Sequence, residues 1–332
     1  MKRVLIAKAA GFCYGVQRAV DITLQVRKET ADRVTSLGMV AHNHHLTDKL
    51  LAQGIESSAD LGAVREGTII LSAHGVPPET RLQAEQQGLT IVDVTCPFVT
   101  RAQRYARQMV DQGYQVLLLG EVNHPEVRGI VGSADGKVTV IGSVDDLAGI
   151  SLGRRVAIIS QTTQQADMLQ RVAKEVSAKA FEVRVFNTIC HATEELQEAA
   201  VELAKKCDIA IVVGGRNSAN TARLREIMEA EGCPSFHVES AAEIREAWLM
   251  EAETIGITAG ASTPDWLIEE VARRVNGGEL PEDFRIQHPD EKTMAKFFGE
   301  TDNIGGRNLV DQKSLATTAS AGDKTPWSAP RD

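Results

Sequence analysis

The residues with the most distinctive potential chemistry are three of the five cysteines, Cys13, Cys96 and Cys190. Each follows or ends a strand-like run of residues and precedes a helix-like segment. The other two, Cys207 and Cys233, open an apolar strand and occupy a Gly-Cys-Pro turn, and we expect them to be small buried hydrophobic residues. Thiolates bind soft metals and iron–sulfur clusters, so the question is whether the first three cysteines meet in space.

Polar loops follow the three cysteines at nearly equal distances. The intervals are 29, 28 and 27 residues, from Cys13 to His42, from Cys96 to His124 and from Cys190 to Asn217. A second polar loop follows in each case, at Ser72–Gly75, Ser160–Thr163 and Thr258–Ser262. A third strand then leads to the next cysteine, and in the last unit this strand would be the N-terminal Lys2–Lys8. The sequence therefore predicts a threefold, circularly permuted repeat.

The elements that must position these residues alternate between short apolar runs and helix-like segments, which indicates an α/β fold class. Most of the runs are continuously apolar at their centres, as is typical of parallel strands covered on both faces. The expected strands are Val4–Ala7, Thr35–Val40, Thr68–Ser72, Thr90–Val94, Val116–Leu119, Val156–Ser160, Glu182–Phe186, Ile209–Val213 and Thr254–Thr258. Helical stripes separate them, at Phe98, Ala102, Tyr105, Ala106 and Met109, and again at Leu196, Ala199, Ala200 and Leu203.

The repeat predicts three pseudo-symmetric α/β domains around one axis, with the polar loops at the carboxyl ends of the strands and converging on one cavity. The predicted divisions are residues 14–96, residues 97–190, residues 191–276 together with 1–13, and a C-terminal extension over 277–332. Residues 278–300 could still pack through Phe284, Phe297 and Phe298. From about residue 301 the composition turns to Gly, Ser, Thr, Asp and Pro, and we expect disorder there.

Three thiolates related by an approximate threefold axis suit three corners of a [4Fe–4S] cluster, leaving one iron without a protein ligand. An open metal position indicates chemistry rather than a structural role. Zinc held by three cysteines and one histidine is the competing hypothesis. Structural zinc sites usually bring their ligands in close pairs, and this sequence has no such pair.

The other loop residues suggest an anionic substrate. His42, His74 and His124 supply imidazoles, and neutral donors accompany them at Ser218, Asn220 and Ser262. A set rich in donors and close to helix N-termini, but without lysine, suits a diphosphate. Glu126 is one of two carboxylates in these loops, the other being Glu121. It could relay a proton, with Thr162 or Thr163 passing the hydrogen bond to a substrate hydroxyl, or it could stabilise a helix start.

Composition limits the remaining classes. The chain has 332 residues and a net charge of −9, which argues against non-specific nucleic-acid binding. No apolar run reaches the roughly 18–20 residues that span a bilayer, and the apolar N-terminal stretch is too short for a secretory signal. We therefore expect a cytoplasmic protein that binds neither membranes nor nucleic acid.

Nine ordered motifs together resemble the IspH/LytB family, the 4-hydroxy-3-methylbut-2-enyl diphosphate reductases, over about residues 3–275. The motifs are Ala10–Val16, His42–Asn43, Ser72–Gly75, Asp93–Pro97, Asn123–Glu126, Gln161–Thr163, Asn187–Cys190, Asn217–Asn220 and Thr258–Pro264. The resemblance implies a trefoil of three α/β domains around a [4Fe–4S] cluster. It also implies reductive removal of the substrate hydroxyl, giving isopentenyl and dimethylallyl diphosphates, with two electrons from a ferredoxin or flavodoxin.

The resemblance assigns residue roles as well. Cys13, Cys96 and Cys190 would bind the cluster, whose open iron would hold the substrate oxygen as an alkoxide, while Glu126 with Thr162 would handle the protons. The diphosphate would be held by His42, His74, His124, Ser218, Asn220 and Ser262.

Two departures from the family pattern affect affinity more than reaction type. Ala219 stands where many members have a second serine, and Leu196–Gln197 where many have Arg-Gln, although Thr193 is retained.

Two rival functions remain, a dehydratase that uses the open iron only as a Lewis acid and a diphosphate-binding sensor. A requirement for Glu126 would distinguish the reductase from the sensor, because a sensor needs no acid at that position.

Overall fold

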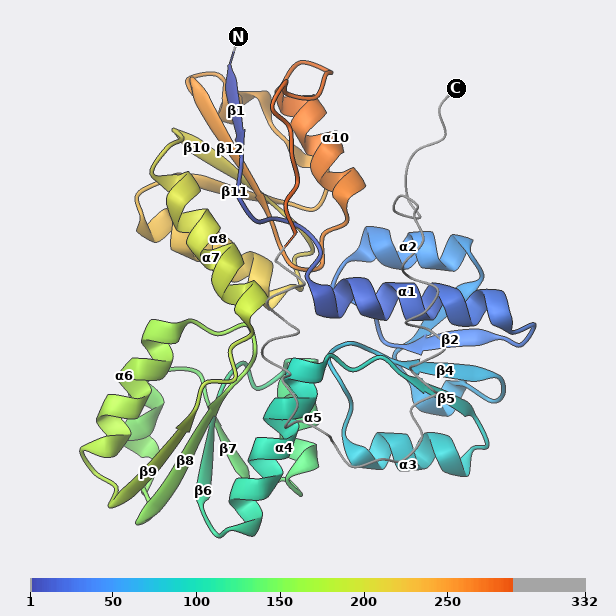
Figure 1. The fold of residues 1–332 in the computed structure, drawn as a ribbon, viewed down its shortest axis with the longest axis vertical. Coiled ribbons are helices and arrows are strands. Elements are labelled where there is room, and N and C mark those ends of the chain that lie inside the picture. The colour runs from blue at the N-terminus through green and yellow to red at the C-terminus, as the bar shows by residue number, and fades with distance from the viewer. Residues whose placement is uncertain (1, 289–332) are drawn as a thin grey trace. The chain divides into compact units, whose positions relative to one another are not determined.

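Three parallel β-sheets, each with its own helices, are arranged around a common centre (Figure 1). The computed structural model describes residues 2–288, which belong to one compact unit. Each sheet has four strands, and every neighbouring pair of strands is parallel. The predicted α/β fold class, with three units in a trefoil arrangement, is confirmed.

The three sheets share one strand order. In the first, β3 (Ile55–Ser58), β2 (Val34–Leu37), β4 (Thr68–Leu71) and β5 (Thr90–Asp93) are neighbours in that order. The second contains β7 (Val138–Ile141), β6 (Gln115–Leu119), β8 (Arg155–Ser160) and β9 (Glu182–Phe186). The third contains β11 (Ser235–Val238), β10 (Ile209–Val213), β12 (Thr254–Ala259) and β1 (Arg3–Ile6).

The N-terminal strand completes the third sheet. β1 pairs in parallel with β12, with Arg3 opposite Thr254 and Ile6 opposite Ile257. It therefore takes the place that β5 and β9 take in the other two sheets. The predicted circular permutation of the repeat is confirmed.

All nine predicted strands are present, with ends that differ by up to three residues. The largest difference is at the strand predicted to reach Val40, which ends at Leu37 because Gly38 (φ +71°) turns the chain. Three strands that were not predicted, β3, β7 and β11, occupy the same edge of each sheet. Each has only four residues.

The helices cover the faces of the sheets. They are α1 (Tyr14–Glu29), α2 (His44–Ala52), α3 (Pro78–Gln86), α4 (Pro97–Asp111), α5 (Pro125–Ser133), α6 (Ala166–Ser177), α7 (His191–Ala204), α8 (Ala219–Ala230), α9 (Glu246–Leu249) and α10 (Asp265–Val275). Short 3-10 turns lie at Leu61–Ala63, Asp145–Gly149 and Ala241–Glu243. Both predicted helical stripes face the core, on α4 and α7, with Tyr105 partly buried.

After α10, Leu280, Phe284 and Ile286 pack against the apolar layer of the third sheet, as expected for this part of the extension. The predicted disorder from about residue 301 lies outside the described residues. Within residues 2–288, no helix has the length and apolar character that crossing a membrane would need.

Candidate active site

The three repeated cysteines occupy equivalent positions. Cys13, Cys96 and Cys190 are the N-cap residues of α1, α4 and α7. Each backbone N–H donates to a carbonyl oxygen in the loop after the third strand of its own unit. The partners are Ala261 for Cys13 (3.1 Å), Ala73 for Cys96 (2.9 Å) and Thr162 for Cys190 (3.0 Å). The backbone around the thiols therefore follows the threefold repeat, and each thiol lies at a helix N-terminus that favours negative charge.

The three thiols lie close to one another in the interior. All are free and keep some accessible surface, yet burial raises the pKa of each to about 12, and each thiol is also affected by the charge of a neighbouring one. A Cβ atom added at Gly15 would lie 2.6 Å from the Cys96 sulfur and 4.0 Å from the Cys13 sulfur, so the starts of α1 and α4 are in contact.

Three imidazoles form a cluster beside them. The ring centroids of His42 and His74 are 3.9 Å apart, and that of His124 lies 5.1 Å from His42 and 5.7 Å from His74. Burial lowers the pKa of His42 and of His124 to about 4, and burial with the two neighbouring rings lowers that of His74 well below its usual value. The rings are therefore neutral near pH 7 in the absence of an anion.

Glu126 lies in the first turn of α5, two residues after His124, the N-cap residue, whose Nδ1 accepts from the Glu126 N–H at 3.2 Å. Its carboxyl group faces Thr162, which lies in the loop after β8, the other polar loop of the second unit. The Thr162 N–H donates to Oε1 at 2.7 Å and the Thr162 hydroxyl donates to Oε2 at 2.8 Å. Burial raises the pKa of Glu126 to about 7, against the opposing effect of these two bonds. Glu126 can therefore hold or release a proton at neutral pH.

The third unit contributes two buried polar side chains, Asn220 and Ser262, of which only Asn220 lacks a hydrogen-bond partner among the described residues. Asn220 is 3% exposed, and neither its amide nitrogen nor its amide oxygen has a hydrogen bond within the described residues. Ser262 is also buried, and its hydroxyl donates to the His42 carbonyl oxygen at 3.1 Å, joining the first and third units. Leaving a buried amide unpaired costs about 1–3 kcal/mol, so Asn220 is ready for a polar ligand.

Sequence reasoning missed two residues that set the direction of hydroxyl groups. Thr221 donates its N–H and its hydroxyl to the Ser218 oxygen, at 3.2 and 2.9 Å. Gln161 donates to the Thr163 hydroxyl oxygen at 3.0 Å. Ser218 and Thr163 each keep their own hydroxyl hydrogen for a ligand. Gln161 and Thr221 lie inside or beside quoted motifs, but nothing in the sequence shows which way their side chains point.

The thiols suit an iron–sulfur group better than a hard cation, because soft sulfur donors select iron–sulfur clusters, zinc and copper(I). Among residues 2–288, no three His, Cys, Asp or Glu side chains are close enough to hold a single metal ion. Each thiol's pKa is raised further by a neighbouring thiol, so the three lie near enough to act on one another. Three thiols that are near one another but cannot hold a single ion fit a cluster of several iron atoms.

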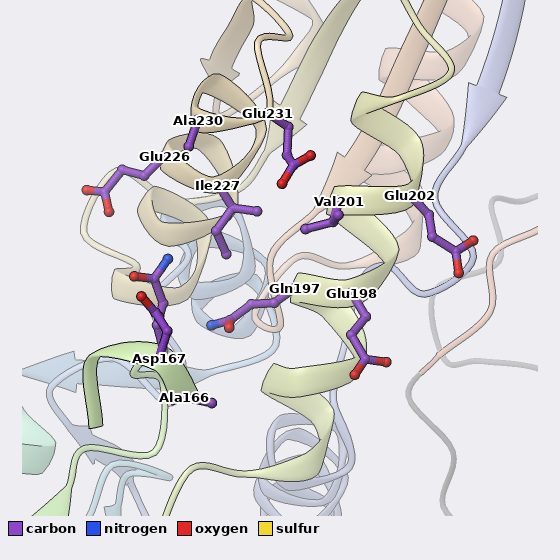
Figure 2. A pocket seen from close by; sticks show the side chains of 11 residues that line it. Ala166, Asp167, Gln197, Glu198, Val201, Glu202, Glu226, Ile227, Ala230 and Glu231 are labelled. Carbon is purple, nitrogen blue, oxygen red and sulfur yellow. The ribbon is translucent and has the colours of Figure 1, made fainter. Parts of the chain in front are cut away.

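Two surface cavities lie elsewhere, and no predicted site residue lines either. One, of about 810 Å³, lies between α7, α8 and the start of α6 (Figure 2). Five carboxylates line it, which makes it unsuitable for a diphosphate; they are Asp167, Glu198, Glu202, Glu226 and Glu231. The other, of about 560 Å³, is bordered by Glu121, Gln164 and Arg223. The described structure brings the three thiols close to one another and to Glu126, and it places the three imidazoles, the Glu126–Thr162 pair and the Ser262–His42 pair in contact.

Residues 4–276 match the profile of a family described as LytB protein. The chain belongs to this family. It is 42% identical over 278 residues to the 4-hydroxy-3-methylbut-2-enyl diphosphate reductase of Pelobacter propionicus, covering 84% of this chain and 98% of that protein. The enzyme of the same name from Aquifex aeolicus is 38% identical over 278 residues, covering 83% and 96%.

A solved structure titled as the E-1-hydroxy-2-methyl-but-2-enyl-4-diphosphate reductase from Plasmodium falciparum is similar to this LytB-family chain with a TM-score of 0.80. It is 25% identical, and the match covers 96% of this chain and 98% of that chain. These findings confirm the resemblance drawn from the nine motifs.

Proposed function

We propose that this LytB-family chain is the oxidoreductase 4-hydroxy-3-methylbut-2-enyl diphosphate reductase. It removes the substrate hydroxyl to give isopentenyl and dimethylallyl diphosphates, the last step of the methylerythritol phosphate route. The observation that carries the proposal is that three kinds of group lie near one another, since Glu126 acts on the Cys96 and Cys190 thiols and is hydrogen-bonded to His124. These are three equivalent thiols, a buried carboxyl group with a pKa of about 7, and a three-imidazole cluster.

A [4Fe–4S] cluster would be held by Cys13, Cys96 and Cys190, one thiolate from each unit. When bound, it would supply the electrons one at a time and an iron without a protein ligand as a Lewis acid for the substrate hydroxyl. The positive helix N-termini behind the three sulfurs stabilise the thiolate charge that the cluster needs.

The reaction consumes two electrons and two protons, and releases the hydroxyl as water. Glu126 is the proton source for the leaving hydroxyl, because its pKa keeps much of it protonated near pH 7. Thr162 donates its own hydrogen to Glu126, so the lone pairs of its hydroxyl oxygen are free to accept from the substrate hydroxyl. The two residues thus position the hydroxyl and protonate it from one hydrogen-bonded pair.

The diphosphate is held at the other end of the cavity. His42, His74 and His124 donate N–H groups, Ser218 and Thr163 donate hydroxyl hydrogens, and Asn220 and Ser262 lie buried beside them. Ala219 supplies a backbone amide in place of a second hydroxyl. An anion is stabilised here by many directed bonds rather than by a fixed positive charge.

Electrons come from a ferredoxin or flavodoxin in the cytoplasm, where a reducing environment keeps the thiols free to bind the cluster. The test is anaerobic turnover of the hydroxy-allylic diphosphate by cluster-loaded protein with a low-potential donor. We expect both isomeric diphosphates and one water for every two electrons. Release of water without electron uptake would identify a dehydratase, and tight binding without turnover would identify a sensor.

A further inference from the structure

Cys207 and Cys233, the two cysteines outside the predicted cluster site, are neighbours just before two strands of the third sheet. Their sulfur atoms are 3.6 Å apart. Cys207 precedes β10 and Cys233 precedes β11, which are adjacent and parallel, with Ala210 opposite Ser235. Neighbouring strands lie about 4.8 Å apart, which is within the range of Cα separations that disulfides span.

The two thiols have different access to solvent. Cys233 is 3% exposed and belongs to the apolar layer beneath α7 and α8, whereas Cys207 is only partly buried. A Cβ atom at Gly256 would lie 2.7 Å from the Cys207 sulfur, so the missing side chain there provides the room that this sulfur occupies. A small oxidant in solution can therefore reach the Cys207 sulfur, whereas the Cys233 sulfur is shielded from it.

We propose that Cys207 and Cys233 form a reversible oxidation site, a dithiol that a small disulfide such as oxidised glutathione converts into an intramolecular disulfide. The hydrogen bond between the sulfurs lowers the pKa of Cys233 and raises that of Cys207, so Cys207 must first give up its proton, to Cys233 or to solvent, before it can attack. The site is separate from the cluster and does not depend on the proposed reaction.

The exchange takes two steps. The Cys207 thiol loses its proton, and its thiolate attacks one sulfur of oxidised glutathione, breaking that S–S bond and releasing one glutathione thiolate. Cys233, also deprotonated, then attacks the Cys207 sulfur and displaces the second glutathione thiolate. Two protein thiols are oxidised, one glutathione disulfide is reduced, and the two protons pass to the released glutathione thiolates.

The test uses full-length, cluster-loaded protein equilibrated anaerobically with glutathione buffers of increasing oxidised fraction, then alkylated under denaturing conditions and mapped by mass spectrometry. We expect free thiols to fall by two of five, together, with one linked peptide that contains Cys207 and Cys233. Visible absorbance from the cluster should be retained. The proposal is overturned if both thiols stay free at the most oxidising ratio, or if glutathione adducts form without the link.

Two variants make the test specific. Cys233→Ser should leave a glutathione adduct on Cys207 and no link, and Cys207→Ser should leave Cys233 reduced because it is shielded. If Cys233→Ser fails to fold, Cys233→Ala serves in its place. A link that forms in the wild-type protein only after unfolding in urea would also overturn the proposal, because it would show that the native strands hold the sulfurs apart.

Discussion

At Glu126, two opposing effects act on one carboxyl group. The hydrogen bonds from Thr162 favour the ionised form, while burial favours the neutral form, and burial prevails with a pKa of about 7. Thiolates at Cys96 and Cys190 would add like charge nearby and favour the protonated acid further. The local environment thus converts an ordinary carboxylate into an acid that works at neutral pH.

Glu126→Gln should reduce kcat by at least about 100-fold, because the amide keeps the shape but cannot deliver a proton. In the wild-type protein, kcat should fall as pH rises above about 7, where Glu126 loses its proton. The control is Glu121→Gln, an exposed carboxylate in the same loop, which should leave kcat unchanged. Steady-state rates and visible absorbance measure both effects, and normal turnover by Glu126→Gln with its cluster intact would remove the proton role.

The histidine cluster predicts proton uptake on anion binding. His42 and His124, with pKa values of about 4, are neutral at pH 7.5, and a diphosphate placed against the rings raises their pKa values. Calorimetry of inorganic pyrophosphate binding in two buffers of different ionisation enthalpy should show net proton uptake. Affinity should fall as pH rises through the bound-state pKa values. A pH-independent affinity without proton uptake would mean that neutral imidazoles act only as hydrogen-bond donors.

At the scale of elements, helix starts carry most of the site. Besides the three cysteines, the N-cap residues include Asn43 of α2, His124 of α5 and Ser218 of α8, each of which accepts a hydrogen bond from its own first turn. In the proposed site, the side chains of His124 and Ser218 would therefore both cap a helix and bind the ligand. The helix-start role that the sequence left open belongs to Glu126, which lies in the first turn of α5 while both of its carboxyl oxygens accept hydrogen bonds from Thr162.

Thr221→Val should raise KM about 2- to 10-fold with little change in kcat, because it removes one hydrogen bond that orients Ser218. Valine keeps the shape of threonine, which matters because a Cβ atom at Gly260 would lie 1.9 Å from the Thr221 hydroxyl oxygen. Thr221→Ser retains the hydroxyl and should restore KM. Equal KM values for valine and serine would show that Thr221 acts only in packing.

Gly15→Ala should prevent cluster assembly, since its new methyl group would occupy space beside the Cys96 sulfur. Gly149→Ala is the matched control, because a Cβ atom there meets no atom within 4 Å. Iron content and visible absorbance after anaerobic reconstitution provide the measurement. A Gly15→Ala protein with full iron content would mean that the starts of α1 and α4 separate easily.

The sequence predicted the central strands and one edge strand of each sheet but missed the opposite edge strands, β3, β7 and β11, for a physical reason. Ile70 and Ile158 lie in strands buried on both faces, which produces a continuous apolar run. The missed edge strands are four residues long and mix polar with apolar residues, as in Ser235–Val238, so their burial depends on tertiary contacts. The sequence could not show that Thr221 orients the Ser218 hydroxyl or that Gln161 orients the Thr163 hydroxyl, because both roles depend on the direction in which a side chain points.

At the scale of the whole molecule, one of the three thiols follows an edge strand of each sheet, and the thiols lie close to one another. We propose that the three domains are residues 14–96, 97–190 and 191–276 with 1–13, so that each cysteine is the last residue of one domain. In this arrangement every cysteine follows the last strand of one domain and caps the first helix of the next. The proposed cluster site is then a property of the assembled molecule rather than of any one unit.

Changing any one of Cys13, Cys96 and Cys190 to serine should therefore cause the same loss of the cluster, because each supplies one equivalent corner through an equivalent N-cap. Cys207→Ser is the control, since this cysteine precedes β10 and is not one of the three proposed ligands, so the variant should retain full iron content. Iron and acid-labile sulfide per chain, measured after anaerobic reconstitution, test the equivalence. If one of the three variants kept a complete cluster with wild-type turnover, that cysteine would not be a ligand, and the threefold repeat would describe the backbone but not the metal site.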